Sequence, residues 1–158
     1  MPDMLVNLLK LPPLEPVLQD LAASQIQVRR AQPFEITPVM EFIEEEFSVR
    51  WADEISVGFS NKPVSVFIAT VEGNVVGFAA YECTRRNFFG PTGVAEDLRG
   101  RGVGKGLVLA GLWGLREMGY AYGVIGRVGP IAFYEKTVGA IPILDSEPGI
   151  YTDLLKSY

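Results

Sequence analysis

Residues 93–107, GVAEDLRGRGVGKGL, form a glycine-rich stretch in which four glycines alternate with other residues. Three cations lie at or within it: Arg99, Arg101 and Lys105. A β-rich segment precedes the stretch and an apolar, helix-like segment follows it, so a turn between a strand and a helix is expected. The first turn of a helix has free backbone N–H groups and the positive end of the helix dipole. Glycines let a ligand approach that backbone closely, so the pattern predicts a site for phosphate or diphosphate.

Three phosphate-binding patterns can be compared with this stretch. The Walker A pattern, G-x-x-x-x-G-K-[ST], does not fit because Arg99 stands at the position of its first glycine. The dinucleotide pattern, G-x-G-x-x-G, lacks its last glycine whether it is counted from Gly100 or from Gly102. The pattern R-x-x-G-x-G fits residues 99–104 at every position. Spacing alone leaves open a glycine-rich turn without a ligand.

Composition limits the class of protein. The chain has 158 residues and is 48% hydrophobic, which predicts one domain with a sizeable core. Its net charge of −5 argues against general nucleic-acid binding, which normally needs a basic excess. The chain has no histidine, which excludes Ser-His-Asp and Cys-His catalysis and the usual zinc sites, and we expect no metal.

Cysteine use and hydropathy suggest where the protein works. The single cysteine, Cys83, cannot form an internal disulfide, and we interpret it as a small strand residue in a reducing cytoplasm. The N-terminus has no basic region before an apolar core, so no signal peptide is expected. No apolar run approaches the roughly 18–20 residues of a membrane helix. We therefore expect a cytoplasmic protein without a membrane or nucleic-acid partner.

The order of predicted elements describes an α+β (mixed α/β) single domain with a mixed sheet. A short helix at about 14–23 packs on the core or on a partner subunit, which leaves a homodimer open. An amphipathic helix has Thr37 as its N-cap, and residues 51–61 form a second short helix or a loop. The other predicted elements are strands at 26–30 and 85–95, a hairpin at 63–84, a buried helix at 103–118, a strand at 120–126, a helix at 130–139, and extended pieces at 141–144 and 149–155.

Two segments in order resemble motifs of one family. VAEDLRGRGVGKGL resembles motif A of the GNAT family of acyl-CoA-dependent N-acyltransferases, and AFYEKTVGA resembles its FYEK.GF segment. The order of elements from Ile26 to about Leu155 is also similar. The resemblance implies a GNAT-like domain over residues 25–158, with residues 1–24 as an N-terminal extension that carries a short helix. It implies a central, mostly antiparallel sheet flanked by helices, whose strands at about 88–95 and 121–126 splay apart at the cofactor site.

The same resemblance implies how acetyl-CoA binds as co-substrate. Backbone N–H groups of the glycine-rich turn would bind the pyrophosphate, and the preceding strand would pair with the pantetheine arm like an added strand. A backbone N–H near Val94 would polarise the thioester carbonyl. The implied cofactor-binding residues are Thr92, Gly93, Val94, Arg99, Gly100, Arg101, Gly102, Val103, Gly104 and Lys105.

The resemblance also implies catalytic residues. Tyr134 stands at the position of the family's general acid, and a tyrosine pKa of about 10 suits protonation of a thiolate whose conjugate acid has a pKa of about 8.5–9. The general base is not evident; Glu82, on the strand before the cofactor strand, is the best candidate. Many members have Asn seven residues before the tyrosine, where this chain has Arg127. That puts the usual cofactor contact at this position in doubt, and Arg127 could reach a phosphate or an acidic substrate.

The prediction is an N-acetyltransferase that acts on a primary amine of a small molecule or peptide by direct attack on the thioester. Six residues lie in segments that flank the acceptor side in similar folds: Trp51, Asp53, Glu54, Phe59, Arg85 and Arg86. The carboxylates among them suit a cationic amine, and the two arginines suit a substrate with a carboxylate. The sequence does not distinguish between these two substrate classes. Two alternatives stay open: a non-catalytic acyl-CoA-binding regulatory domain, and a nucleotide-binding module unrelated to CoA.

Overall fold

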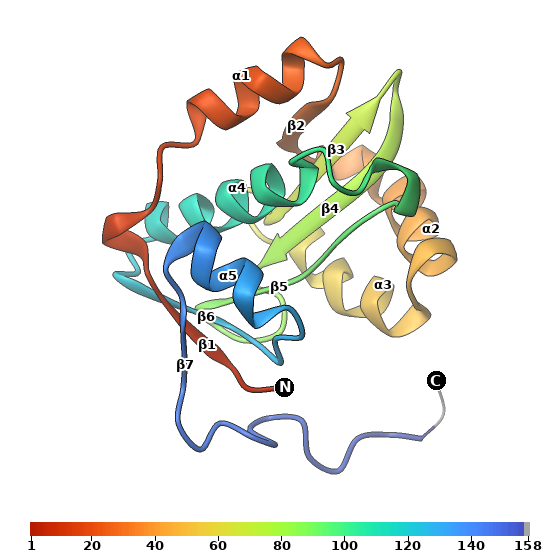
Figure 1. Cartoon of the computed structure of the whole chain (residues 1–158). Helices are drawn as coiled ribbons and strands as arrows, with labels where there is room; N and C mark the ends of the chain where they lie inside the picture. Colours follow the sequence, from red (N-terminus) through yellow and green to blue (C-terminus); the bar gives the residue numbers. More distant parts are fainter. Residues whose placement is uncertain (157–158) are drawn as a thin grey trace.

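A seven-stranded sheet separates two layers of helices (Figure 1). The structure is a computed structural model, and it describes residues 1–156. The strands lie in the order β2-β3-β4-β5-β6-β1-β7, and all neighbours are antiparallel except the parallel pair β5 and β6. This confirms the predicted mixed, mostly antiparallel sheet. The strands are β1 (Met4–Asn7), β2 (Gln27–Arg30), β3 (Val66–Val71), β4 (Asn74–Tyr81), β5 (Phe88–Val94), β6 (Tyr122–Ile125) and β7 (Ile141–Pro142).

Five α-helices cover the two faces of the sheet. They are α1 (Glu15–Ala23), α2 (Ile36–Glu46), α3 (Val49–Ser56), α4 (Val103–Glu117) and α5 (Ile131–Val138). Helices α1, α4 and α5 contribute to one apolar core, and α2 and α3 contribute to the other. The helix predicted to have Thr37 as its N-cap begins at Ile36 instead, with Glu35 at the N-cap position. A 3₁₀ turn, Pro33–Glu35, leads into it, and the capping box is formed by Gln32 and Glu35.

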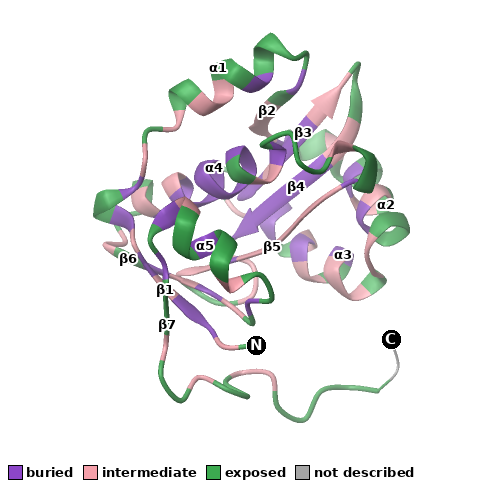
Figure 2. Cartoon of the chain, in the orientation of Figure 1, coloured by how far each residue is buried: buried purple, intermediate pink, exposed green. Residues whose placement is uncertain are grey.

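Strand β4 contributes side chains to both apolar cores, one on each face of the sheet. Phe78 and Ala80 belong to the core with α2 and α3, whereas Ala79 and Tyr81 belong to the core with α4. The alternation follows from the period of two along a strand, and burial of both faces accounts for the almost continuous apolar sequence. Figure 2 shows β4 and α4 as the most continuously buried elements. No helix within residues 1–156 has the length and apolar character needed to cross a membrane.

Helix α4 carries glycines on the face that packs against the sheet, where aromatic rings leave no room for a Cβ. A Cβ at Gly114 would lie 2.5 Å from the ring of Tyr81, and one at Gly111 would lie 2.5 Å from the ring of Phe89. The two aromatic rings therefore fill the space that larger helix residues would need. This packing fixes the second half of α4 against β4 and β5.

Strands β5 and β6 pair over only two residues each. Phe88 pairs with Val124 and Phe89 with Ile125, after which β6 ends while β5 continues to Val94 against β4. The chain leaves β6 through Gly126 and turns into α5. The splay that the family resemblance implied is therefore present, and it lies beside both α4 and α5 (Figure 1).

The first 24 residues contribute to the sheet as well as to a helix. Strand β1 lies between β6 and β7, and helix α1 packs on α4, where Leu21 occupies the space next to Gly106. The sequence predicted the helix but not the strand. The division between an extension at 1–24 and a domain at 25–158 stays a prediction.

The C-terminal segment after β7 runs back across the molecule toward α3 without a helix or strand in the described residues 143–156 (Figure 1). The extended piece predicted at 149–155 therefore pairs with no strand. The contacts that hold the segment include an ion pair of Glu147 with the N-terminal amine and a hydrogen bond from Arg50 Nη2 to Leu155 O, 3.0 Å. It consequently forms a strap on the side of the sheet where β5 and β6 diverge.

Candidate functional site

The glycine-rich turn before α4 has backbone conformations that favour glycine. Gly100 and Gly102 have φ of +81° and +83°, in the left-handed region that L side chains avoid. Gly102 is the N-cap of α4, and the first helical hydrogen bond runs from Gly106 N to Gly102 O, 3.1 Å. The N–H groups from Val103 to Lys105 precede that bond and are available to a ligand. The turn can therefore donate several backbone hydrogen bonds to one anion.

The three cations of the turn differ in their contacts. Arg101 and Lys105 are exposed and form no salt bridge with any residue in the described part of the chain. Arg99 instead folds back, and its Nε donates to Val94 O at 3.1 Å. Arg99 thus closes the loop between β5 and α4, whereas Arg101 and Lys105 supply positive charge at the helix N-terminus, where the helix dipole also favours an anion.

The edge of β5 beyond Phe89 has no strand partner on the side of β6 within residues 1–156. Ala95 N donates to Val76 O on the β4 side, at 2.8 Å. Because antiparallel pairs alternate between bonded and non-bonded, the N–H groups of Val94 and Thr92 point away from β4, toward the open edge. A linear ligand with amide groups could therefore pair with this edge as an extra strand.

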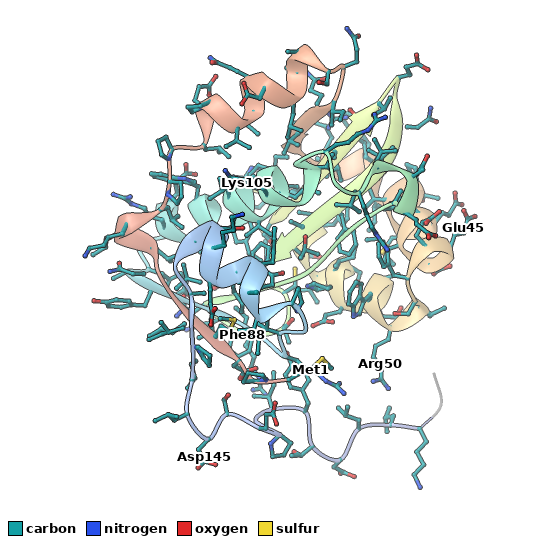
Figure 3. The ribbon with its side chains drawn as sticks, viewed as in Figure 1. Met1, Glu45, Arg50, Phe88, Lys105 and Asp145 are labelled. Carbon is teal, nitrogen blue, oxygen red and sulfur yellow. The ribbon has the colours of Figure 1, made fainter. Side chains whose placement is uncertain are left out.

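A cavity of about 970 Å³ lies where β5 and β6 diverge. A volume in this range suits a small molecule or the end of a cofactor. Figure 3 labels three of its lining residues, Met1, Arg50 and Phe88, which come from the N-terminus, α3 and β5. Thr92 of the predicted cofactor strand also lines it, while Gly93 packs against the ring of Phe47.

Tyr134 on α5 reaches this cavity. The side chain is buried, and its hydroxyl has no hydrogen-bond partner among the residues that the structure describes. Burial raises the pKa of Tyr134 to about 12, so the hydroxyl is fully protonated at neutral pH. The structure thus places a neutral hydrogen-bond donor beside the diverging strands.

Glu82 lies outside the cavity and is engaged elsewhere. Strand β4 ends at Tyr81, and Glu82 has φ of +57°, at the start of the turn to β5. Its Oε2 accepts from Asn87 N at 2.7 Å, and its Oε1 accepts from the hydroxyl of Tyr120 at 2.9 Å. The structure does not bring Glu82 together with Tyr134, and its role as general base stays a prediction.

Four of the six residues predicted for the acceptor side line the cavity: Trp51, Asp53, Glu54 and Arg85. Phe59 packs in the core with α2 and α3, and Arg86 is not among the lining residues. Glu54 accepts a hydrogen bond from the hydroxyl of Thr84, which fixes one carboxylate oxygen at the cavity wall. Cys83 does not line the cavity, and burial raises the pKa of its thiol to about 11.

The cavity wall formed by the C-terminal segment was not predicted from the sequence. Its lining residues are Ile150, Tyr151, Leu154 and Leu155. Arg127 also lines the cavity, and its guanidinium lies over the ring of Tyr151, 5.5 Å from the centroid. The only signal in the sequence was the apolar character of GIYTDLL, which predicts burial but not the surface that the segment covers.

The model of the acetyltransferase (GNAT) family matches residues 27–140. A comparison with curated proteins finds no match.

Similar solved structures include an N-acetyltransferase region of a fungal multi-domain β-N-acetylglucosaminidase, 17% identical with a TM-score of 0.72. They also include a GCN5-related N-acetyltransferase from Sphaerobacter thermophilus, 20% identical with a TM-score of 0.65. Each match covers 90% of this chain but only 19% and 48% of those chains, respectively. An acetyltransferase from Brucella melitensis in complex with acetyl-CoA is 19% identical with a TM-score of 0.53, over 70% of this chain and 80% of that one. These likenesses show the fold.

The anion site predicts a selective effect of Gly102→Ala. Alanine at φ of +83° costs roughly 1–2 kcal/mol and distorts the turn whose amides would hold the anion. We expect millimolar inorganic pyrophosphate to raise the melting temperature of the natural chain but not of Gly102→Ala. Gly73→Ala is the matched control, because Gly73 has φ of +78° in the remote β3–β4 turn. Equal pyrophosphate shifts in both variants would contradict the site.

Proposed function

The chain belongs to the acetyltransferase (GNAT) family, and we propose that it transfers an acetyl group from acetyl-CoA to a primary amine of a small molecule or peptide. The observation that carries this proposal is a continuous path through one side of the fold. It runs from the open turn at Gly102, along the free edge of β5, to the cavity that Tyr134 lines.

The chain offers a partner for the diphosphate, the pantetheine arm and the acetyl group of acetyl-CoA. The N–H groups of the turn, with Arg101 and Lys105, fit the diphosphate. The free edge at residues 90–94 spans roughly 15 Å, at about 3.3 Å per residue, and fits the pantetheine amides as an added strand. The acetyl end would then lie in the cavity. A relative of similar fold from Brucella melitensis was solved with acetyl-CoA, which supports the same co-substrate here.

Acetyl-CoA would supply the acetyl group as a thioester, which the acceptor amine attacks directly. A C–N bond forms and the C–S bond breaks, so a proton must leave the nitrogen and one must reach the sulfur. Of the two outward-facing N–H groups of β5, that of Thr92 belongs to a residue that lines the cavity, whereas Val94, the sequence-predicted position, lies nearer the turn; the N–H of Thr92 is therefore proposed to polarise the thioester carbonyl. By holding both reactants in one cavity, the protein also removes much of the entropic cost of their meeting.

Tyr134 is proposed as the proton donor to the leaving sulfur. With a pKa of about 12, its hydroxyl is always protonated under working conditions. Taking about 8.5 as the pKa of the thiol, the proton transfer is uphill by about 3.5 units, roughly 5 kcal/mol. A hydrogen bond from Tyr134 therefore stabilises the thiolate as it forms, and water returns the proton to the tyrosine after any full transfer.

Two carboxylates are candidates for removing the amine proton. Glu82 is the residue that sequence reasoning favours, but Asn87 and Tyr120 engage both of its oxygens outside the cavity. Glu54 lines the cavity on α3, and its Oε2 accepts a hydrogen bond from the hydroxyl of Thr84. We propose that Glu54 accepts the proton, directly or through a water molecule. Its position within the shared cavity is what supports this choice over Glu82.

Tyr134→Phe separates chemistry from binding. We expect the natural chain to acetylate at least one member of a panel of primary amines, detected by mass spectrometry with acetyl-CoA. Loss of the donor should lower kcat on the order of 100-fold with an unchanged Kd for acetyl-CoA. Tyr122→Phe is the control, because Tyr122 is exposed and does not line the cavity. An unchanged kcat would remove Tyr134 from the mechanism, and binding of acetyl-CoA without product from any amine would favour the binding-only alternative.

A paired exchange, Glu54→Gln and Glu82→Gln, distinguishes the two carboxylates. If Glu54 takes the proton, its variant should lose on the order of 100-fold in kcat while its melting temperature changes little. Glu82→Gln should keep kcat but lose stability on the order of 1 kcal/mol, because two hydrogen bonds weaken. Both kinetics and thermal unfolding are measured for each variant. The reverse pattern would restore Glu82 as the base.

A further inference from the structure

We propose that Tyr151, on the C-terminal segment, positions the acceptor amine: its hydroxyl accepts a hydrogen bond from the amine N–H beside the thioester slot. The inference rests on the proposed function and adds a residue to its acceptor site. It also gives the C-terminal strap a direct part in the reaction.

The location of the Tyr151 hydroxyl carries the proposal. A Cβ built on Gly126 would lie 2.3 Å from that oxygen, so the phenol occupies the space of a missing side chain. Gly126 is the first residue after β6, at the point where the chain has just left β5. The hydroxyl is therefore at the mouth of the gap between the two strands, in the same cavity as Tyr134.

Several contacts hold the ring in place. The guanidinium of Arg127 lies over it, and the backbone N–H of Tyr151 donates to Pro148 O at 3.0 Å. The position of Arg127 is fixed in turn, because its backbone N–H donates to Asp3 Oδ1 at 2.8 Å. The N–H of Asp3 in turn donates to Ser146 Oγ at 3.0 Å. The buried Asp3 thus joins the loop after β6 to the segment that carries Tyr151.

The strap is fastened on both sides of Tyr151. Glu147 pairs with the N-terminal amine before it, and Arg50 binds the carbonyl of Leu155 after it. Between these points, Ile150 and Leu154 present apolar surface to the cavity. An amine with an apolar body would bury this surface on binding. The strap therefore forms a wall of the acceptor pocket that the two anchors keep in position.

The chemistry available to Tyr151 is that of a neutral phenol. Its hydroxyl has no hydrogen-bond partner in the described residues, and it is only half-buried. Desolvation, together with the charges of Asp3 and Glu54, raises its pKa to about 12, against a smaller opposing effect of Arg127. A protonated phenol does not remove the amine proton, but its oxygen accepts an N–H and so directs the nitrogen lone pair toward the carbonyl. Tyr151 is thus a positioning residue rather than a base.

Tyr151→Phe removes the hydroxyl and keeps the ring, so the strap should stay packed and the melting temperature should hold. With the amine that the natural chain acetylates best, we expect kcat/KM to fall about tenfold, the usual value of one hydrogen bond. The loss should appear mainly in the KM for the amine, while the Kd for acetyl-CoA is unchanged. Tyr122→Phe, an exposed tyrosine outside the cavity, is the matched control.

Gly126→Ala tests the geometry independently. The added Cβ would displace the hydroxyl, so this variant should also lose activity toward the amine. In the Tyr151→Phe background the colliding oxygen is gone, and the same change should cost much less. If the two losses multiply instead, the Cβ blocks the slot itself and the proposed position of the hydroxyl is overturned.

Failure of this inference is distinguishable from failure of the proposed function. A natural chain that acetylates no amine overturns both. An active natural chain whose Tyr151→Phe variant has the same KM for the amine and the same kcat overturns only the role of Tyr151.

Discussion

The short pairing of β5 with β6 is the constraint on which the rest of the site depends. After Phe88 and Phe89 the two strands separate, and this leaves backbone N–H groups of β5 without a strand partner in residues 1–156. Unpaired strand edges normally bind another chain or are protected. Here the edge leads at one end to the cavity and at the other to the open turn before α4. Because β6 separates early from β5, a cavity and an unpaired strand edge lie next to each other, and the edge leads to the anion site before α4.

Local signals predict this part of the molecule well. The alternating glycines permit the left-handed conformations that Gly100 and Gly102 adopt before α4, and the apolar sides of α4 require burial against a sheet. Pro130 and Gly139 delimit α5, where Gly139 has φ of +65° as the C-cap, so the helix that carries Tyr134 could be located from sequence. The two-motif resemblance then implied that Tyr134 and the turn serve one site. The structure confirms the fold behind that implication.

Nonlocal partners explain what the sequence could not predict. Met4–Asn7 is too short to show a period, and it is a strand only because β6 and β7 flank it. The segment that carries Tyr151 is held at the cavity by residues far away in sequence: Asp3 contacts Ser146, Arg127 contacts Tyr151, and Arg50 contacts Leu155. Glu82 was predicted to lie on the strand before the cofactor strand. The strand ends one residue earlier, and a left-handed turn directs the carboxylate to Asn87 and Tyr120.

Amide hydrogen exchange with and without acetyl-CoA tests the central claim most directly, namely that backbone N–H groups of the turn and of the β5 edge hold the acyl donor. We predict slower exchange at residues 92–94 and 100–105 when acetyl-CoA binds, with no change in the β2–β3 pair on the far side of the sheet. Binding of acetyl-CoA, measured independently by calorimetry, with unchanged exchange at these amides would contradict the account.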